Sequence, residues 1–156
     1  MELSDAFKIL KYHGLYKGLR RLIDEYTENI HFDKKYNVVT SKLKFEEDYN
    51  NEKFIKGENK WYQPTYFSPL KKIAIQLDKK IKKNTLIFDL GSGYGKPLII
   101  LNHFINQNNV IYGVELDDTF KKIFEENLAK FNSNFEFLNM KVEEINYEEI
   151  LTKHNL

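Results

Sequence analysis

The 156-residue sequence contains no cysteine, only three prolines and no long apolar run. The absence of cysteine excludes disulfides, thiolate metal sites and thiol nucleophiles, and it is compatible with a reducing compartment. Because no stretch of about 18 apolar residues occurs, no membrane-spanning helix is expected. A signal peptide is not expected either, since the first residues carry acids and lack a long apolar core. We therefore expect a cytoplasmic protein.

The sequence also lacks an excess of charge of either sign. Its 24 Lys and Arg nearly balance its 23 Asp and Glu, for a net charge of +1. Nucleic acid is therefore not the expected partner, because a strong positive field is missing. The four histidines have no spacing that would place two of them on one helical face, so no metal site is expected. Hydrophobic residues, at 42%, are sufficient for a core.

Residues 1–60 are charged and aromatic, contain few glycines and no proline, and are expected to form an N-terminal helical region. Apolar residues recur at helical spacing within 15–30, which predicts a long helix there after a first short one. A short strand is expected at Asn37–Thr40. Residues around Gly57 favour a surface loop.

Residues 61–156 alternate regularly between two kinds of pattern. Ser68 followed by Pro69 is typical of a helix start. Short apolar runs predict buried strands, and amphipathic segments between them predict helices. The expected strands cover 85–90, 110–115 and 135–139, and the expected helices 69–82, 97–106, 117–131 and 142–153. This order predicts an α/β fold with a Rossmann-like parallel sheet.

A glycine turn between the first strand and its helix is the main candidate for a binding site. It carries Gly91, Gly93 and Gly95, and glycine allows a sharp turn and close approach of a ligand. Amide groups at the following helix start favour an anionic group. Glu115 ends the next strand, where an acid can accept hydrogen bonds from ribose hydroxyls. The turn therefore predicts a nucleotide-type cofactor.

Two cofactors suit this arrangement. The dinucleotide pattern G-x-G-x-x-G requires a third glycine where this chain has Lys96. Asp89 lies two residues before the first glycine, and a carboxylate there does not assist a pyrophosphate. It does suit a cationic ammonium group, such as that of S-adenosylmethionine. We therefore favour S-adenosylmethionine, and a nicotinamide-dependent oxidoreductase remains an alternative.

Asp89–Gly95 together with Gly113-Val114-Glu115 resembles the class I, seven-stranded S-adenosylmethionine-dependent methyltransferases. Upstream, Tyr62-Gln63-Pro64-Thr65 resembles the Tyr-x-x-Thr loop of the disruptor-of-silencing-type histone-lysine methyltransferases. The resemblance covers residues 61–140. It implies that Tyr62 and Thr65 line the methionine end of the cofactor, and that residues 61–156 hold the N-terminal half of the methyltransferase domain.

The resemblance further implies methyl transfer to a protein lysine, and adds the nucleus as an alternative location. Two departures limit it. No acid follows the third strand, in the stretch 137–141, where the family has one near adenine. The chain ends at Leu156, before the family's fourth strand and the loop that holds the methyl acceptor, so the fold is expected to be incomplete at its C-terminus.

These departures leave the catalytic residues unknown and keep a non-catalytic, cofactor-binding remnant as an alternative to an enzyme. They also leave the first strand at a sheet edge. We expect that edge to associate with a second chain or with the Asn37–Thr40 segment.

Overall fold

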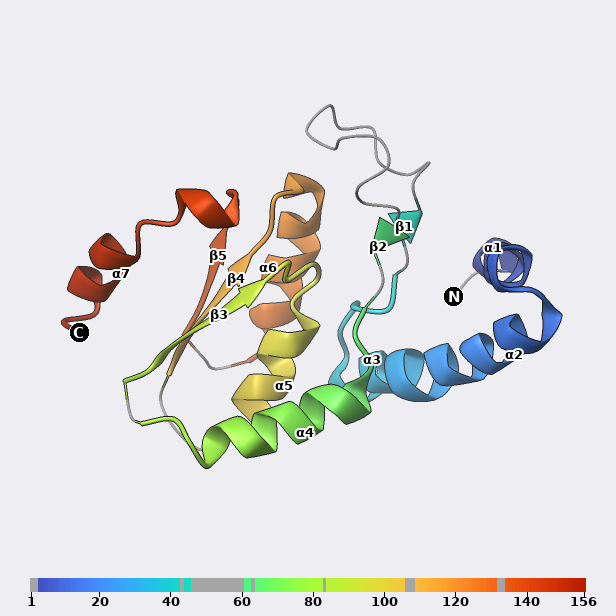
Figure 1. Ribbon diagram of the computed structural model, residues 1–156, viewed down its shortest axis with the longest axis horizontal. Helices are drawn as coiled ribbons and strands as arrows, with labels where there is room; N and C mark the ends of the chain where they lie inside the picture. Colours follow the sequence, from blue (N-terminus) through green and yellow to red (C-terminus); the bar gives the residue numbers. More distant parts are fainter. Residues whose placement is uncertain are drawn as a thin grey trace. The chain divides into compact units, whose positions relative to one another are not determined.

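The computed structural model describes residues 3–42, 44–45, 61–62, 64–82, 84–105, 109–131 and 134–156 (Figure 1). The chain forms two compact units, Met1–Lys72 and Ile73–Leu156. The surface loop expected around Gly57 lies outside the described residues. No described helix combines the length and the apolar character that crossing a membrane requires.

The N-terminal unit is built mainly from helices. Gly14, with a φ of 74°, separates the first helix from a continuous helical rod, so the predicted helix from Leu15 is confirmed and extends beyond residue 30. The rod passes through one π-helical segment without a break. The elements are α1 (Leu3–His13), α2 (Leu15–Asp24), the π-helix η1 (Glu25–Ile30) and α3 (His31–Tyr36).

The predicted strand at Asn37–Thr40 is wrong. Asn37 ends α3 in the left-handed conformation, with a φ of 54°, which reverses the chain direction. The buried carboxylate of Asp33 then accepts hydrogen bonds from the Thr40 amide, at 2.8 Å, and from its hydroxyl, at 2.6 Å. A side-chain acceptor therefore replaces the strand partner that this β-branched segment would need. This segment is accordingly no strand that could pair with a sheet edge.

The strands of this unit lie elsewhere. β1 (Lys44–Phe45) and β2 (Trp61–Tyr62) form a short antiparallel pair. They bring together two segments that are separated by residues outside the described part of the chain.

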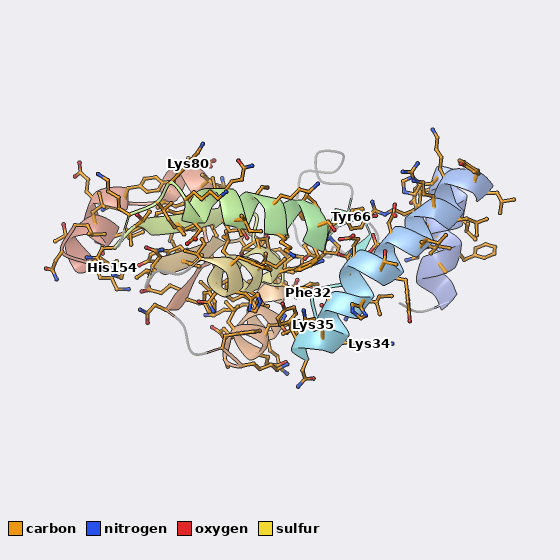
Figure 2. The ribbon with its side chains drawn as sticks, turned by 90° about the horizontal axis from the view of Figure 1, so that it is seen from below. Phe32, Lys34, Lys35, Tyr66, Lys80 and His154 are labelled. Atoms are coloured by element: carbon orange, nitrogen blue, oxygen red, sulfur yellow. The ribbon has the colours of Figure 1, made fainter. Side chains whose placement is uncertain are left out.

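Helix α4 (Phe67–Asp78) begins one residue before Ser68, so the predicted N-cap role of Ser68 is wrong. Ser68 instead donates through its amide and its hydroxyl to the Glu28 carboxylate, at 2.8 and 2.7 Å. The helix start is thus held by a residue 40 positions away in the sequence. Next to it, the Arg21 guanidinium lies 4.8 Å from the centre of the Tyr66 ring (Figure 2).

The C-terminal unit is α/β, with a Rossmann-like parallel sheet in the order β3-β4-β5. Its strands and helices match the predicted segments within a few residues, apart from short 3₁₀ turns before two helices. The elements are β3 (Leu86–Leu90), α5 (Lys96–Phe104), β4 (Val110–Val114), η3 (Asp118–Phe120), α6 (Lys121–Leu128), β5 (Phe135–Leu138), η4 (Val142–Glu144) and α7 (Tyr147–Lys153). β3 is an edge strand of the sheet that the described residues form.

The two faces of this sheet are covered differently. Helices α5 and α6 lie on one side and α7 lies on the other (Figure 1). Phe124 of α6 packs on Phe137, with ring centres 4.6 Å apart. Asp89 pairs in register with Gly113, which pairs with Phe137, so these three residues share the face toward α6. The glycine turn directly follows β3, so Asp89 on this face lies next to the turn.

Helix α7 is attached to the opposite face by a polar cluster. The buried Tyr112 hydroxyl and His154 Nε2, at the end of α7, share a hydrogen bond of 2.7 Å (Figure 2 labels His154). Lys153 forms an ion pair with Glu136 on β5. Burial raises the pKa of Tyr112, so its hydroxyl stays protonated at neutral pH. On the same face, Tyr147 contacts Phe88 edge-to-face.

Candidate functional site

The predicted glycine turn lies between the end of β3 and the start of α5. Gly91, Gly93 and Gly95 have φ values of 82°, 49° and 82°, which L side chains rarely adopt. The amides of Gly91 and Ser92 both donate to the Val114 carbonyl, at 2.8 and 3.0 Å. These bonds attach the turn to the carboxyl end of β4.

Glu115 lies directly after β4 and is fixed by two backbone amides. Its Oε2 accepts from the Gly93 amide at 3.0 Å, and its Oε1 accepts from the Asp117 amide at 3.1 Å. Asn139, after β5, donates through its side-chain nitrogen to the Glu115 carbonyl at 2.9 Å. A carboxylate oxygen has room for more than one donor, so Glu115 can also accept hydrogen bonds from a ligand.

Asp89 lies on the same sheet face, one strand away. Its Oδ2 is buried and accepts no hydrogen bond from the described residues. Burial, and then the neighbouring Glu115 carboxylate, raise the pKa of Asp89 to about 6. Asp89 therefore presents a buried carboxylate oxygen without a donor beside the Glu115 carboxylate, and a nearby cation would stabilise the ionised form of Asp89.

The amides of the turn are already used inside the protein. Gly91 and Ser92 donate to Val114, Gly93 donates to Glu115, and Gly95 donates to the Ser92 carbonyl at 2.9 Å. A pyrophosphate would need such amides to be free, and it would meet carboxylates instead. These four amides lie before α5, so the expectation that amides at the start of that helix favour an anionic group stays a prediction. The site suits a ligand with hydroxyl and cationic groups.

The aromatic ring of Phe124 packs closely against Gly113 and Gly95. A Cβ atom added to Gly113 would lie 2.6 Å from this ring and 2.8 Å from the Ser92 hydroxyl. At Gly95 the added atom would lie 3.1 Å from the same ring. Gly113 is therefore required by close packing of α6 and the turn against β4.

We expect Gly113→Ala to lower the free energy of unfolding by about 1–3 kcal/mol, because the added methyl group overpacks the site. Denaturant unfolding of the purified variant measures this. Gly113→Ala combined with Phe124→Leu is the matched test, since the smaller side chain leaves room for the methyl group. If the second substitution fails to recover stability relative to Phe124→Leu alone, Phe124 is not the source of the clash.

Two predicted site residues belong to the other unit. Tyr62 ends β2 and is partly exposed, and Thr65 is exposed before α4. Pro64 between them is buried. The glycine turn, Asp89 and Glu115 all belong to the C-terminal unit. The role of Tyr62 and Thr65 toward a cofactor remains a prediction.

The sequence did not predict that a residue of α6 hydrogen-bonds to the glycine turn. Asn127 of α6 is almost fully buried and donates from its side chain to the Tyr94 carbonyl at 2.9 Å. Its position among inward apolar residues of a predicted helix was the available signal, because a buried amide needs an acceptor.

Lys96, at the place of the third dinucleotide glycine, is fully buried at the start of α5.

Searches for known relatives found no matching family model and no matching curated protein. The chain is similar to three solved methyltransferase structures. A protein from Methanococcus maripaludis assigned as an S-adenosyl-L-methionine-dependent methyltransferase shares 21% identity, with a TM-score of 0.44, over 51% of this chain and 37% of its own. A protein from Pyrococcus horikoshii assigned as an RNA methyltransferase shares 26% sequence identity, with a TM-score of 0.39. The match covers 51% of this chain and 37% of that protein. A protein-L-isoaspartate O-methyltransferase shares 15% sequence identity, with a TM-score of 0.42. The match covers 56% of this chain and 27% of that protein. The chain thus spans between 27% and 37% of the length of these proteins.

Proposed function

We propose that the C-terminal unit binds S-adenosylmethionine and that the protein takes part in methyl transfer from it. The observation that carries this proposal is the buried, unpartnered Oδ2 of Asp89 beside Glu115. S-adenosylmethionine offers an ammonium group for Asp89 and ribose hydroxyls for Glu115, and its sulfonium adds a second positive charge. A nicotinamide dinucleotide would bring a pyrophosphate to the same carboxylates, which is unfavourable.

The residues fit this cofactor in distinct roles. Glu115, held by the Gly93 and Asp117 amides, is the acceptor for the ribose hydroxyls. Asp89 receives the ammonium group, and the glycine turn gives the ligand close access to the backbone. When bound, the cofactor supplies an electrophilic methyl group. The residues of this chain bind and orient it and keep water away.

We further propose a protein lysine as the methyl acceptor. The support is the Tyr62-x-x-Thr65 pattern upstream of the Asp89 turn, which resembles the histone-lysine branch. In this proposal Tyr62 and Thr65 cover the methionine end of the cofactor.

Calorimetric titration of the full chain tests the cofactor. We expect saturable binding of S-adenosylmethionine and no binding of a nicotinamide dinucleotide. S-adenosylhomocysteine serves as a third ligand, because it retains the ribose and the ammonium group and lacks the sulfonium charge. Binding of the dinucleotide in place of S-adenosylmethionine would overturn the proposal.

The acceptor is tested separately by transfer of a radiolabelled methyl group to core histones, to a general protein extract and to RNA. Label in a protein lysine, located by hydrolysis of the labelled product, supports the finer proposal. Label in RNA alone would contradict it and leave the cofactor assignment intact.

The covering role of Tyr62 and Thr65 leads to a prediction about local protection. We expect amide hydrogen exchange in residues 61–68 to slow when S-adenosylmethionine is added, because a loop that covers a ligand is held in place by it. Exchange measured by mass spectrometry, with and without cofactor, checks this. The opposite sheet face, at α7, serves as the internal control. Equal exchange of 61–68 in both states would assign these residues an ordinary structural role.

A further inference from the structure

The α2 helix presents an exposed apolar stripe, which the proposed cofactor site does not use. Its side chains are between 49% and 82% exposed. We call the following five residues the α2 stripe, of which the first four lie on α2 and the last lies on the π-helix η1 that continues it: Leu15, Tyr16, Leu19, Ile23 and Tyr26. At about 100° per residue they occupy one side of the helix. Two further exposed aromatic residues, Phe7 and Tyr12, lie on the neighbouring helix α1.

The other side of the same rod already packs within the N-terminal unit. Gly18 is buried against Leu10 of α1, because a Cβ at Gly18 would lie 2.9 Å from the Leu10 side chain. Glu25 and Asn29 are also buried, and they hydrogen-bond to each other. The core side of the rod is therefore distinct from the α2 stripe. The stripe does not form part of the core of its own unit.

The exposed apolar area is large for a helix pair. An aromatic side chain covers roughly 150–250 Å² and an aliphatic one less, so the five side chains of the α2 stripe together present on the order of 500 Å². Monomeric soluble proteins rarely expose a contiguous apolar patch of more than a few hundred Å². A standard protein interface covers about 800 Å² on each partner. The α2 stripe is thus large for a monomer surface and supplies more than half of the area of a standard interface.

The spacing of the stripe is symmetric about its midpoint. Tyr16, Leu19, Ile23 and Tyr26 follow one another at intervals of three, four and three residues. Two such helices in antiparallel orientation place Leu19 opposite Ile23 of the second copy, and Tyr16 opposite its Tyr26. A self-complementary pattern of this kind suits a two-fold symmetric pair.

The charges beside the stripe differ in sign between the two halves of α2. Lys17 and Arg20 lie in the N-terminal half of α2, and Asp24 lies at its C-terminal end. In the antiparallel pair Asp24 of one copy lies two residues, about 3 Å along the axis, from the level of Arg20 of the other, which the long arginine side chain can span, and the contact occurs twice. Arg21 does not take part, because it is tied to Glu25 at 2.6 Å and to the Tyr66 ring.

We propose that the α2 stripe is a homodimer interface, in which α2 pairs antiparallel with α2 of a second copy of this chain. The proposal is independent of the cofactor assignment, since it uses no residue of that site.

Sedimentation of the full chain over a range of concentrations tests the association. We expect a reversible dimer, and we expect Leu19→Glu with Ile23→Glu to weaken it by at least about a hundredfold, because two apolar contacts on each copy are lost. Ile73→Glu is the matched control, because Ile73 is a similarly exposed isoleucine on α4. A wild-type monomer throughout, or a dimer that the α2 variant leaves intact, would overturn the proposal.

A charge exchange tests the orientation. Arg20→Asp alone should weaken the dimer, since it places two acidic residues opposite each other. Arg20→Asp combined with Asp24→Arg should restore it, because the exchanged pair is again complementary. A double variant no better than the single one would contradict the antiparallel arrangement.

The absence of cysteine allows a direct second measurement. We expect chains carrying Leu19→Cys to form a disulfide with chains carrying Ile23→Cys when the two are mixed and oxidised, since these positions face each other. Each variant alone should cross-link much less. Preferential linking of Leu19→Cys to itself would show a parallel pair and overturn the proposal.

Discussion

Replacing Asp89 with Asn is expected to make the protein more stable and, at the same time, to remove most of its affinity for S-adenosylmethionine. The Asp89 side chain is half-buried, its buried Oδ2 accepts no hydrogen bond from the described part of the chain, and Glu115 lies nearby. An ionised group in that position destabilises the empty protein at neutral pH. A shift of the pKa from 3.8 to about 6 corresponds to a gain of about 2–3 kcal/mol on removing the charge.

The sign of the pH dependence follows from the direction of this shift. Because the pKa of Asp89 is higher in the folded than in the unfolded protein, the folded state binds the proton more tightly. The stabilisation is complete below the unfolded pKa of 3.8 and is lost as pH rises toward about 6. In the Asp89→Asn variant, this loss of folding stability with rising pH should not occur. Denaturant unfolding of both proteins between pH 4 and pH 7 would show it as a difference that grows with pH.

Asp33→Asn is the matched control. Asp33 is also a buried carboxylate, but it accepts hydrogen bonds from the amides and hydroxyls of Thr40 and Ser41. An amide group cannot accept all of them, so this variant should be less stable than the wild type. If both variants change stability in the same direction, the unpaired state of Asp89 is not the cause of its effect.

The same titration should govern cofactor binding. An ammonium ligand prefers the ionised Asp89, so affinity for S-adenosylmethionine should fall as pH drops below about 6, approaching tenfold per pH unit. Titration calorimetry at several pH values measures it. The fall should be absent in Asp89→Asn. An equal pH dependence in that variant would assign the titration to another group.

The strands of the C-terminal unit could be predicted from the sequence because their apolar runs are short and bounded by turn residues. Asn37–Thr40 shows the limit of that reasoning. Its β-branched residues are typical of a strand, yet its hydrogen bonds go to Asp33. Ser68 shows the same limit, because its partner Glu28 lies far away in the sequence. Side-chain acceptors that come from distant segments leave no local pattern.

The placement of Asp89, the glycine turn and Glu115 in the fold could be predicted from the sequence, and their hydrogen bonding could not. The motif identified Asp89, the glycine turn and Glu115, since strand ends of a parallel sheet meet at one edge. It could not show that the Gly93 amide is bound to Glu115, because this depends on the register of β3 and β4. That bond matters for chemistry. It gives the Gly93 amide an acceptor within the protein and places the Glu115 carboxylate at the turn.

Glu115→Ala is expected to weaken S-adenosylmethionine binding by about ten- to a hundredfold. Charge-assisted hydrogen bonds contribute about 1.5–3 kcal/mol, and the loss includes the acceptor for the Gly93 amide. Glu136→Ala is the control, because Glu136 is a carboxylate on the α7 face of the sheet. Calorimetric titration of both variants at neutral pH gives the comparison. Unchanged affinity in a folded Glu115→Ala protein would exclude Glu115 as a ligand.

Glu115→Gln separates the charge of this residue from its hydrogen bonding. The glutamine oxygen can still accept from one amide, while the negative charge is lost. Because the Glu115 carboxylate contributes to the raised pKa of Asp89, that pKa should move down toward its ordinary value in the variant. The pH at which S-adenosylmethionine affinity falls should therefore move down as well, in addition to any loss of affinity at neutral pH. A lower affinity with an unmoved pH profile would show that the two carboxylates act independently.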